Sequence, residues 1–171
     1  MAINFLLTAA TGIAIAAHQG QTRKNNDPYV FHPIRVASML ALHNESEDVC
    51  AAALLHDVLE DTFYSIPITI PYHVKELVEL LTNRHSGEPG NKMASIEKLK
   101  GNRDAILIKM ADRLDNYIGE TDCTNTNKFS VEYLKRKSVR KSTEHLLFLA
   151  REIGLGFHPI YIQLESVLKS A

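Results

Sequence analysis

The 171-residue chain has only two cysteines, Cys50 and Cys123, and a net charge of −1. Two isolated cysteines exclude the disulfide framework of small secreted domains, and their contexts form neither a Cys-x-x-Cys redox pair nor a zinc knuckle. The near-zero charge argues against a protein that coats nucleic acid or adsorbs to membranes. These absences predict a protein of the reducing cytoplasm.

The chain has no lysine or arginine before Arg23, although residues 2–17 are largely apolar. A secretory signal peptide begins with a positively charged region, and this stretch is also interrupted by Asn4, Thr8 and Thr11. It is too short to span a bilayer. We interpret it as a core helix, with a signal or transit peptide as the alternative.

No alternating strand pattern and no internal repeat competes with helical periodicity along the chain. Apolar residues recur at helical spacing at Phe5, Ala9, Ile13 and Ala16, and the pattern resumes after Pro33. Further helices are predicted over residues 47–59, 73–82, 93–100, 103–118, 130–153 and 159–170. The sequence therefore predicts an all-α fold.

Composition predicts one domain, because 45% hydrophobic and 23% charged residues are the content of a globular chain with its own core. Turn-forming residues mark the loops, and no piece between them has enough apolar residues for a separate core. Pro33 and Pro159 suit the first turn of a helix, where a missing N–H does no harm. Residues 1–171 are expected to form a single helical bundle.

The most informative pattern is His56-Asp57, which follows an apolar helical run. Imidazole and carboxylate bind divalent cations, and His32 and Asp112 are further candidate ligands. Singly, each would be interpreted as a packed histidine or a helix cap. Together, two imidazoles and two carboxylates without a thiolate favour a six-coordinate ion such as Mn²⁺, with Mg²⁺, Fe²⁺ and Zn²⁺ as alternatives.

Two acidic residues follow the His-Asp pair after two apolar residues. Adjacent residues of a continuous helix point about 100° apart, so His56 and Asp57 can share an ion only beside a helix end. Glu60 and Asp61 follow at a spacing that brings side chains near one helical face. They are candidates to orient or deprotonate a water, and a solvated acidic helix end is an equal alternative.

Four motifs occur in order over most of the chain: AHQGQTRK (17–24), PYVFHP (28–33), HDVLEDT (56–62) and KMADRLDN (109–116). Together they resemble the HD-domain phosphohydrolase superfamily. More narrowly, they are similar to the hydrolase domain of RelA/SpoT-type alarmone enzymes, including small alarmone hydrolases and metazoan SpoT homologs. A lone His-Asp pair is weak evidence, whereas four ordered motifs are specific.

The resemblance implies a helical HD fold that binds one Mn²⁺ through His32, His56, Asp57 and Asp112. It implies that Glu60 and Asp61 activate the hydrolytic water. Arg23 and Lys24 would contact the nucleotide base or its phosphates, and Asn116 would lie in the substrate site. The expected reaction removes the 3′-pyrophosphate from guanosine tetra- or pentaphosphate, which gives GDP or GTP and pyrophosphate.

The helix predicted after Phe129 supplies positive charge for the substrate phosphates. Its basic residues are Lys135, Arg136, Lys137, Arg140 and Lys141. Tyr133 precedes Arg136 by one turn, so Tyr133 and Arg140 are candidate substrate-binding residues, with a solvated basic face as the alternative. No nucleic-acid motif accompanies this helix, which makes nucleic-acid binding a weaker interpretation.

The chain departs from the family pattern in two places. No synthetase domain follows Ala171, so we do not expect alarmone synthesis, and residues 82–100 align poorly, which leaves the roles of Arg84 and Lys92 open. Alternative substrates are an adenosine-type alarmone, the 2′-phosphate of NADPH or another nucleotide. A catalytically silent nucleotide-binding module is a further alternative. The predicted partner is a small nucleotide, with neither nucleic acid nor membrane.

Overall fold

The computed structural model describes residues 5–23, 25–83, 91–118 and 136–170. Within these ranges the regular structure is helical, and strand-like pairing is confined to one isolated bridge between Thr22 and Pro28. The all-α fold class is therefore confirmed. In the same ranges, no helix combines the length and the apolar character needed to cross a membrane.

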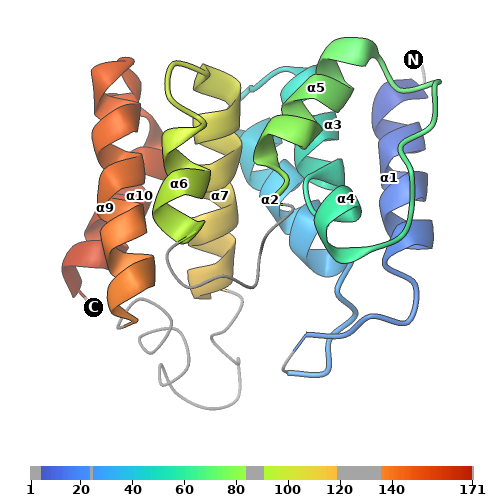
Figure 1. Ribbon diagram of the computed structural model, residues 1–171, viewed down its shortest axis with the longest axis horizontal. Coiled ribbons are helices and arrows are strands. Elements are labelled where there is room, and N and C mark those ends of the chain that lie inside the picture. The colour runs from blue at the N-terminus through green and yellow to red at the C-terminus, as the bar shows by residue number, and fades with distance from the viewer. Residues whose placement is uncertain (1–4, 24, 84–90, 119–135, 171) are drawn as a thin grey trace. The chain divides into compact units, whose positions relative to one another are not determined.

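The chain forms two compact units, Met1–Arg84 and His85–Ala171. The first contains α1 (Phe5–Ala17), α2 (Phe31–Leu42), α3 (Glu47–Leu55), α4 (Val58–Asp61) and α5 (Tyr72–Leu81). The second contains α6 (Asn91–Glu97), α7 (Arg103–Ile118), α9 (Lys137–Glu152), the 3₁₀ helix η1 (Leu155–Phe157) and α10 (Pro159–Ser170) (Figure 1). The single domain expected from composition stays a prediction.

Helix α3 is the central element of the first unit and contacts α1, α2 and α5. Its residues 49–55 are all buried. A helix that is covered on all sides must be apolar around its circumference. This run of valine, cysteine, alanine and leucine meets that requirement. Ser46 begins the helix, because its hydroxyl oxygen accepts a hydrogen bond from the backbone N–H of Val49 at 3.3 Å.

The sequence predicts one helix over residues 47–59, but the chain turns between α3 and α4. His56 has φ −59° and ψ −31°, whereas Asp57 has φ −96° and ψ −9°. The latter pair of angles lies near the sparsely allowed bridge region, in which many active-site residues are found. The turn provides the helix end beside which the adjacent candidate ligands His56 and Asp57 can share an ion.

Other helix bounds agree closely with the periodicity. Helices α7 and α10 occupy the predicted ranges 103–118 and 159–170, and α2 begins two residues before the buried Pro33, which lies in its first turn. Of the helix predicted over 130–153, α9 occupies Lys137–Glu152, while residues 130–135 lie outside the described part of the chain.

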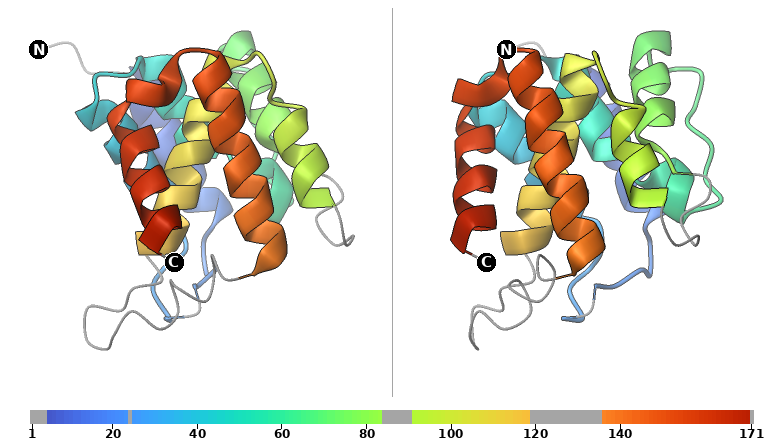
Figure 2. Two further views of the ribbon diagram at one scale, coloured as in Figure 1. Left: turned by 90° about the vertical axis from the view of Figure 1, so that its left-hand side faces the viewer. Right: turned by 60° about the vertical axis from the view of Figure 1, so that its left-hand side comes forward.

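Helix α7 supplies much of the core of the second unit. Helices α7, α9 and α10 contact one another, and α6 contacts α9 (Figure 2). Their buried side chains include Ile96, Ile106, Leu107, Ile108, Met110, Leu114, Leu146 and Leu164. At about 25 cal/mol for each Å² of buried apolar surface, such residues dominate the favourable free energy of folding.

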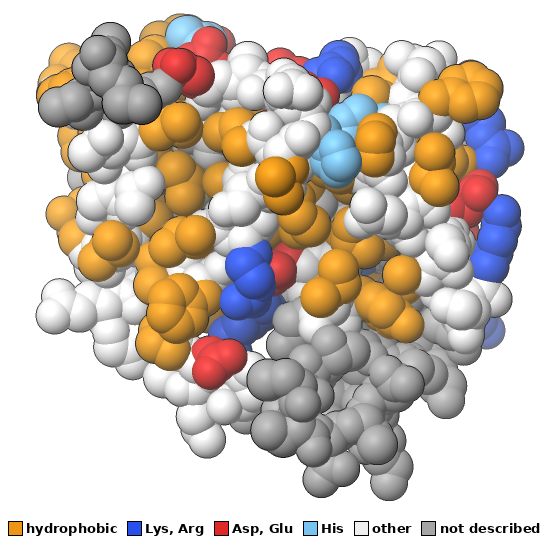
Figure 3. All heavy atoms as spheres, turned by 180° about the vertical axis from the view of Figure 1, so that it is seen from behind, with side chains coloured by type: hydrophobic (Ala, Val, Ile, Leu, Met, Phe, Trp, Pro, Cys, Tyr) orange, Lys and Arg blue, Asp and Glu red, His pale blue; other side chains and the backbone are white. Residues whose placement is uncertain are grey.

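Apolar side chains also reach the surface, scattered among polar ones on the face drawn in Figure 3. Among the described residues, the most exposed large apolar side chains are Phe63, Phe157, Ile68, Leu42, Phe5 and Tyr72. Scattered exposed apolar residues are ordinary on protein surfaces and do not by themselves mark a binding site.

Candidate metal centre

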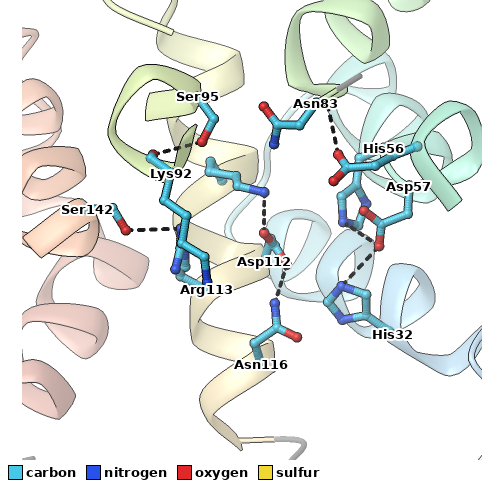
Figure 4. Close-up of polar contacts among 12 residues, drawn as sticks. His32, His56, Asp57, Asn83, Lys92, Ser95, Asp112, Arg113, Asn116 and Ser142 are labelled. Atoms are coloured by element: carbon cyan, nitrogen blue, oxygen red, sulfur yellow. Dashed lines mark hydrogen bonds and ion pairs between the residues drawn. The ribbon is translucent and has the colours of Figure 1, made fainter. Parts of the chain in front are cut away.

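Three candidate ligands gather in the first unit. His32 is the second residue of α2, and His56 and Asp57 form the turn between α3 and α4. Each offers one ligand atom, and these atoms all lie within 4.8 Å of one another (Figure 4). Both histidines are buried and Asp57 is partly exposed. The fold thus brings together ligands from two segments that are distant in sequence.

The tautomer of His56 shows why a cation fits between these side chains. Its Nδ1 lies 2.7 Å from the carbonyl oxygen of Ala53, and because a carbonyl can only accept, Nδ1 carries the hydrogen. In a neutral ring, Nε2 then presents a lone pair, 3.2 Å from Oδ2 of Asp57. A lone pair and a carboxylate oxygen repel each other unless positive charge lies between them.

Both histidines lie close to the same carboxylate oxygen of Asp57. Its Oδ2 lies 3.5 Å from Nε2 of His32 and 3.2 Å from Nε2 of His56. Two imidazole nitrogens with a carboxylate oxygen are a donor set that binds divalent transition ions. The three residues therefore fit part of the coordination shell of a divalent metal ion.

Tyr29 links this cluster to Asp61. Its hydroxyl is 2.7 Å from Oδ2 of Asp57 and 3.0 Å from Oδ2 of Asp61. Burial, followed by the charge of Asp57, raises the pKa of Tyr29 well above its usual range, so the phenol stays a neutral donor. Burial and the Asp57 charge also raise the pKa of Asp61, while the Tyr29 hydrogen bond lowers it.

Sequence reasoning gave Tyr29 no role, although the residue lies within one of the quoted motifs. The available signal was its position three residues before His32, a spacing that brings side chains near each other around one helical turn. The pattern could not show that the hydroxyl reaches the carboxylates at both ends of α4, because those contacts join separate segments.

Glu60 has a different partner from Asp61. Its Oε2 accepts a hydrogen bond of 2.9 Å from the backbone N–H of Asn83, which follows α5 (Figure 4). This contact ties α4 to the end of α5 within the first unit. The sequence could not indicate Asn83 as the partner, because nearly every residue carries a backbone N–H.

Of the two residues of the first motif that are predicted to contact the nucleotide, the structure describes Arg23. The Arg23 guanidinium lies 5.9 Å from the centre of the Tyr29 ring, within cation–π range. The backbone N–H of Arg23 donates to the carbonyl of Asp27 at 2.9 Å. Lys24 and Tyr133 lie outside the described residues.

In the second unit, Asp112 is buried on α7 and both of its oxygens have partners. Lys109 Nζ lies 2.7 Å from Oδ2, and the Asn116 amide donates to Oδ1 at 2.6 Å (Figure 4). The spacing of three and four residues places these side chains on one helical face. Lys109 and Asn116 therefore orient the Asp112 carboxylate from the turns before and after it.

Positive charge in the second unit gathers near Lys92, whose role the sequence left open. Burial and the charges of Arg113 and Arg136 lower the pKa of Lys92. Arg113 is buried and donates to the Ser142 hydroxyl at 3.3 Å (Figure 4). Arg140, the candidate on α9, forms an ion pair with Glu144 at 3.3 Å.

Sequence similarity relates the chain to known proteins. The family described as HD domain matches residues 10–131. The chain is 31% identical over 166 residues to the bifunctional (p)ppGpp synthase/hydrolase SpoT of Escherichia coli K12, a match that covers 91% of this chain and 22% of the relative. A guanosine-3′,5′-bis(diphosphate) 3′-pyrophosphohydrolase of Vibrio cholerae is 31% identical over 178 residues, which cover 92% of this chain and 24% of the relative. The chain thus spans about a quarter of the length of these relatives or less.

A solved structure is similar over almost the whole chain. It belongs to a metazoan ortholog of SpoT that hydrolyzes ppGpp and plays a role in starvation responses. The TM-score is 0.79 at 27% sequence identity, and the match covers 99% of this chain and 97% of the other.

Proposed function

The chain belongs to the HD-domain family, and from this premise we propose that it hydrolyses the 3′-pyrophosphate of guanosine tetra- or pentaphosphate in a manganese-dependent reaction. An HD domain implies a divalent metal, and His32, His56 and Asp57 form a cluster able to bind one. The products are GDP or GTP and pyrophosphate.

The observation that carries this proposal is the position of Asp61 beside the candidate metal ligands. Asp61 and the ligand Asp57 share the hydroxyl of Tyr29, so a carboxylate able to take a proton lies next to the metal cluster. Burial raises the pKa of Asp61, which makes the carboxylate a better proton acceptor. The similarity to a metazoan ppGpp hydrolase supports the same reaction.

His32, His56 and Asp57 would hold a divalent ion, which would polarise a phosphoryl oxygen and favour ionisation of water. Glu60 and Asp61 act on the attacking water, and Asp61 takes its proton. The water oxygen bonds to the phosphorus attached to the 3′ oxygen, and the bond between that phosphorus and the 3′ oxygen breaks. The 3′ oxygen gains one proton while Asp61 holds the one lost by water, and return of the Asp61 proton to the solvent restores the carboxylate. Two imidazoles and hard carboxylate oxygens without a thiolate favour Mn²⁺ as the ion.

Asp112 is proposed as a fourth ligand on the basis of its motif, with Asn116 supporting it. Their hydrogen bond of 2.6 Å gives Asn116 a means to orient the carboxylate.

We propose that the base or the phosphates of the substrate are bound by Arg23, Lys24, Tyr133 and Arg140. The arginine and lysine side chains pair with phosphate through charge-assisted hydrogen bonds. The cysteine usage supports a cytoplasmic location.

The test is a substrate panel with the purified chain in Mn²⁺. We expect stoichiometric GDP and pyrophosphate from guanosine tetraphosphate, separated by anion-exchange chromatography, and loss of this activity in His56→Ala. Activity that is unchanged in His56→Ala would refute the metal assignment.

The same panel separates the alternative functions. Turnover of an adenosine-type alarmone or of NADPH without turnover of guanosine tetraphosphate would replace the proposed substrate. Tight binding of guanosine tetraphosphate without turnover would indicate a nucleotide-binding module, because binding needs the basic groups but not the water-activating carboxylates.

A further inference from the structure

We propose that Tyr29 is a positioning residue that holds the carboxylates of Asp57 and Asp61 in place through one shared hydroxyl. The inference rests on the proposed function, in which Asp57 binds the metal ion and Asp61 takes the proton of water. It assigns a role to a side chain that is neither a ligand nor a proton acceptor.

The need for such a residue follows from the size of α4. Asp57 precedes this four-residue helix and Asp61 ends it, and the Asp61 N–H donates to the Asp57 carbonyl at 2.9 Å. A single helical turn has little intrinsic stability, since nucleation costs more than one hydrogen bond returns. Two nearby carboxylates also repel each other. The helix alone therefore does not fix their relative position.

The Tyr29 hydroxyl opposes that repulsion. It lies 2.7 Å from Asp57 and 3.0 Å from Asp61, so both carboxylates are drawn to the same donor. A hydroxyl carries one hydrogen, which the two oxygens must share. Removing it would leave two carboxylates facing each other with one fewer donor between them.

The surrounding loop keeps Tyr29 in position. The Tyr29 N–H donates to the Gln21 carbonyl at 2.9 Å, beside the bridge between Thr22 and Pro28. The His18 ring lies 4.8 Å from the Tyr29 ring, measured between centroids. An aromatic side chain has few rotatable bonds, so these contacts place its hydroxyl at low entropic cost.

Gln21 holds Asp61 a second time, through the backbone. Its Nε2 donates to the Asp61 carbonyl at 2.9 Å, and its Oε1 accepts from Nδ1 of His18 at 2.8 Å. A carbonyl can only accept, which fixes the orientation of the Gln21 amide. The loop between α1 and α2 thus contacts the end of α4 at both the backbone and the side chain of Asp61.

The test is Tyr29→Phe, which removes the hydroxyl and keeps the ring. We expect the Kd for Mn²⁺, measured from the electron paramagnetic resonance of the free ion, to rise about 10-fold or more, as for other residues that orient metal ligands. We expect kcat for guanosine tetraphosphate to fall at least as much, with little change in KM. If Tyr29 served only the stability of the fold, Tyr29→Phe would leave the Kd for Mn²⁺ unchanged. It would also not lower kcat selectively over KM.

Tyr72→Phe is the matched control. Tyr72 is exposed on α5 and also donates its hydroxyl to a carboxylate, that of Glu76, so the control loses the same kind of hydrogen bond. Its Kd and kcat should equal those of the wild type. A double variant sharpens the assignment: on an Asp61→Asn background, Tyr29→Phe should still weaken Mn²⁺ binding through Asp57 but lower kcat less, because coupled effects are not additive.

The outcomes separate this inference from the proposed function. If the wild type binds Mn²⁺ and hydrolyses guanosine tetraphosphate while Tyr29→Phe behaves identically, the role of Tyr29 is refuted and the function stands. If the wild type neither binds Mn²⁺ nor hydrolyses the nucleotide, the proposed function fails and this inference falls with it.

Discussion

Glu60 shows how one side chain can combine a structural contact with a proposed chemical role. Its Oε2 accepts the Asn83 N–H at 2.9 Å, which joins α4 to the end of α5. The proposed function also assigns Glu60 to the activation of water. An amide can replace a carboxylate in the first role, because its carbonyl oxygen still accepts a hydrogen bond, but in the second role it lacks the negative charge that holds the attacking water strongly.

Glu60→Gln should therefore lower kcat about 10-fold or more, because a charged acceptor holds the water more strongly than a neutral one. Its free energy of unfolding should stay within about 0.5 kcal/mol of the wild type, measured by urea denaturation. Glu60→Ala should lose both properties. Equal stability losses in the two variants would show that the carboxylate charge, and not the hydrogen-bond acceptor, stabilises α4.

Helices α6 and α9 are joined by a hydrogen bond between His145 and Glu97, which makes this contact sensitive to pH. His145 Nε2 on α9 lies 2.6 Å from Oε2 of Glu97 on α6, and the His145 ring stacks on Phe148. The hydrogen bond with His145 holds the pKa of Glu97 below its usual value. A carboxyl whose pKa is lowered on folding stabilises the folded state above its unfolded pKa, and this contribution is lost as the pH falls through the folded pKa.

Glu97→Gln should accordingly lower the melting temperature slightly at pH 6. The difference from the wild type should shrink as the pH falls below about 4.3, the ordinary glutamate pKa, and through the lower pKa of Glu97 in the folded state. The effect is small because an exposed contact of a charged group contributes little. Glu152→Gln, at the exposed end of α9, serves as the control, and a difference that grows on acidification would contradict this assignment.

At the scale of the whole molecule, metal binding and folding are linked. The candidate ligands come from α2 and from the turn between α3 and α4, which the unfolded chain does not hold together. A ligand that binds only the folded state stabilises it according to its concentration relative to the Kd. Mn²⁺ is therefore expected to stabilise the protein as well as to support catalysis.

At a free Mn²⁺ concentration about 100 times the Kd, stabilisation should reach about 2.7 kcal/mol, or roughly 5–10 °C in melting temperature for a chain of this size. EDTA should reverse the rise, and His56→Ala should abolish it, as differential scanning calorimetry can show.

A single calorimetric transition would support the single domain expected from composition, whereas two separate transitions would show that the units Met1–Arg84 and His85–Ala171 unfold independently.

The sequence by itself determined the fold class, the bounds of α7 and α10 and the chemistry of the candidate ligands. These properties are local: helical periodicity repeats within one element, and imidazole and carboxylate bind divalent ions wherever they occur. The motifs also identified the HD-domain family from residue identity and order.

Only the tertiary structure decided which groups lie together in the first unit. It brought His32 to His56 and Asp57, placed the Tyr29 hydroxyl between Asp57 and Asp61, and gave Glu60 the backbone N–H of Asn83. Periodicity reports the faces of one helix but not which segments meet, and a backbone donor has no side-chain signature. The pattern His56-Asp57 could thus predict a ligand pair, whereas only the structure showed that both residues lie in a turn between α3 and α4, where their ligand atoms and that of His32 lie within 4.8 Å of one another.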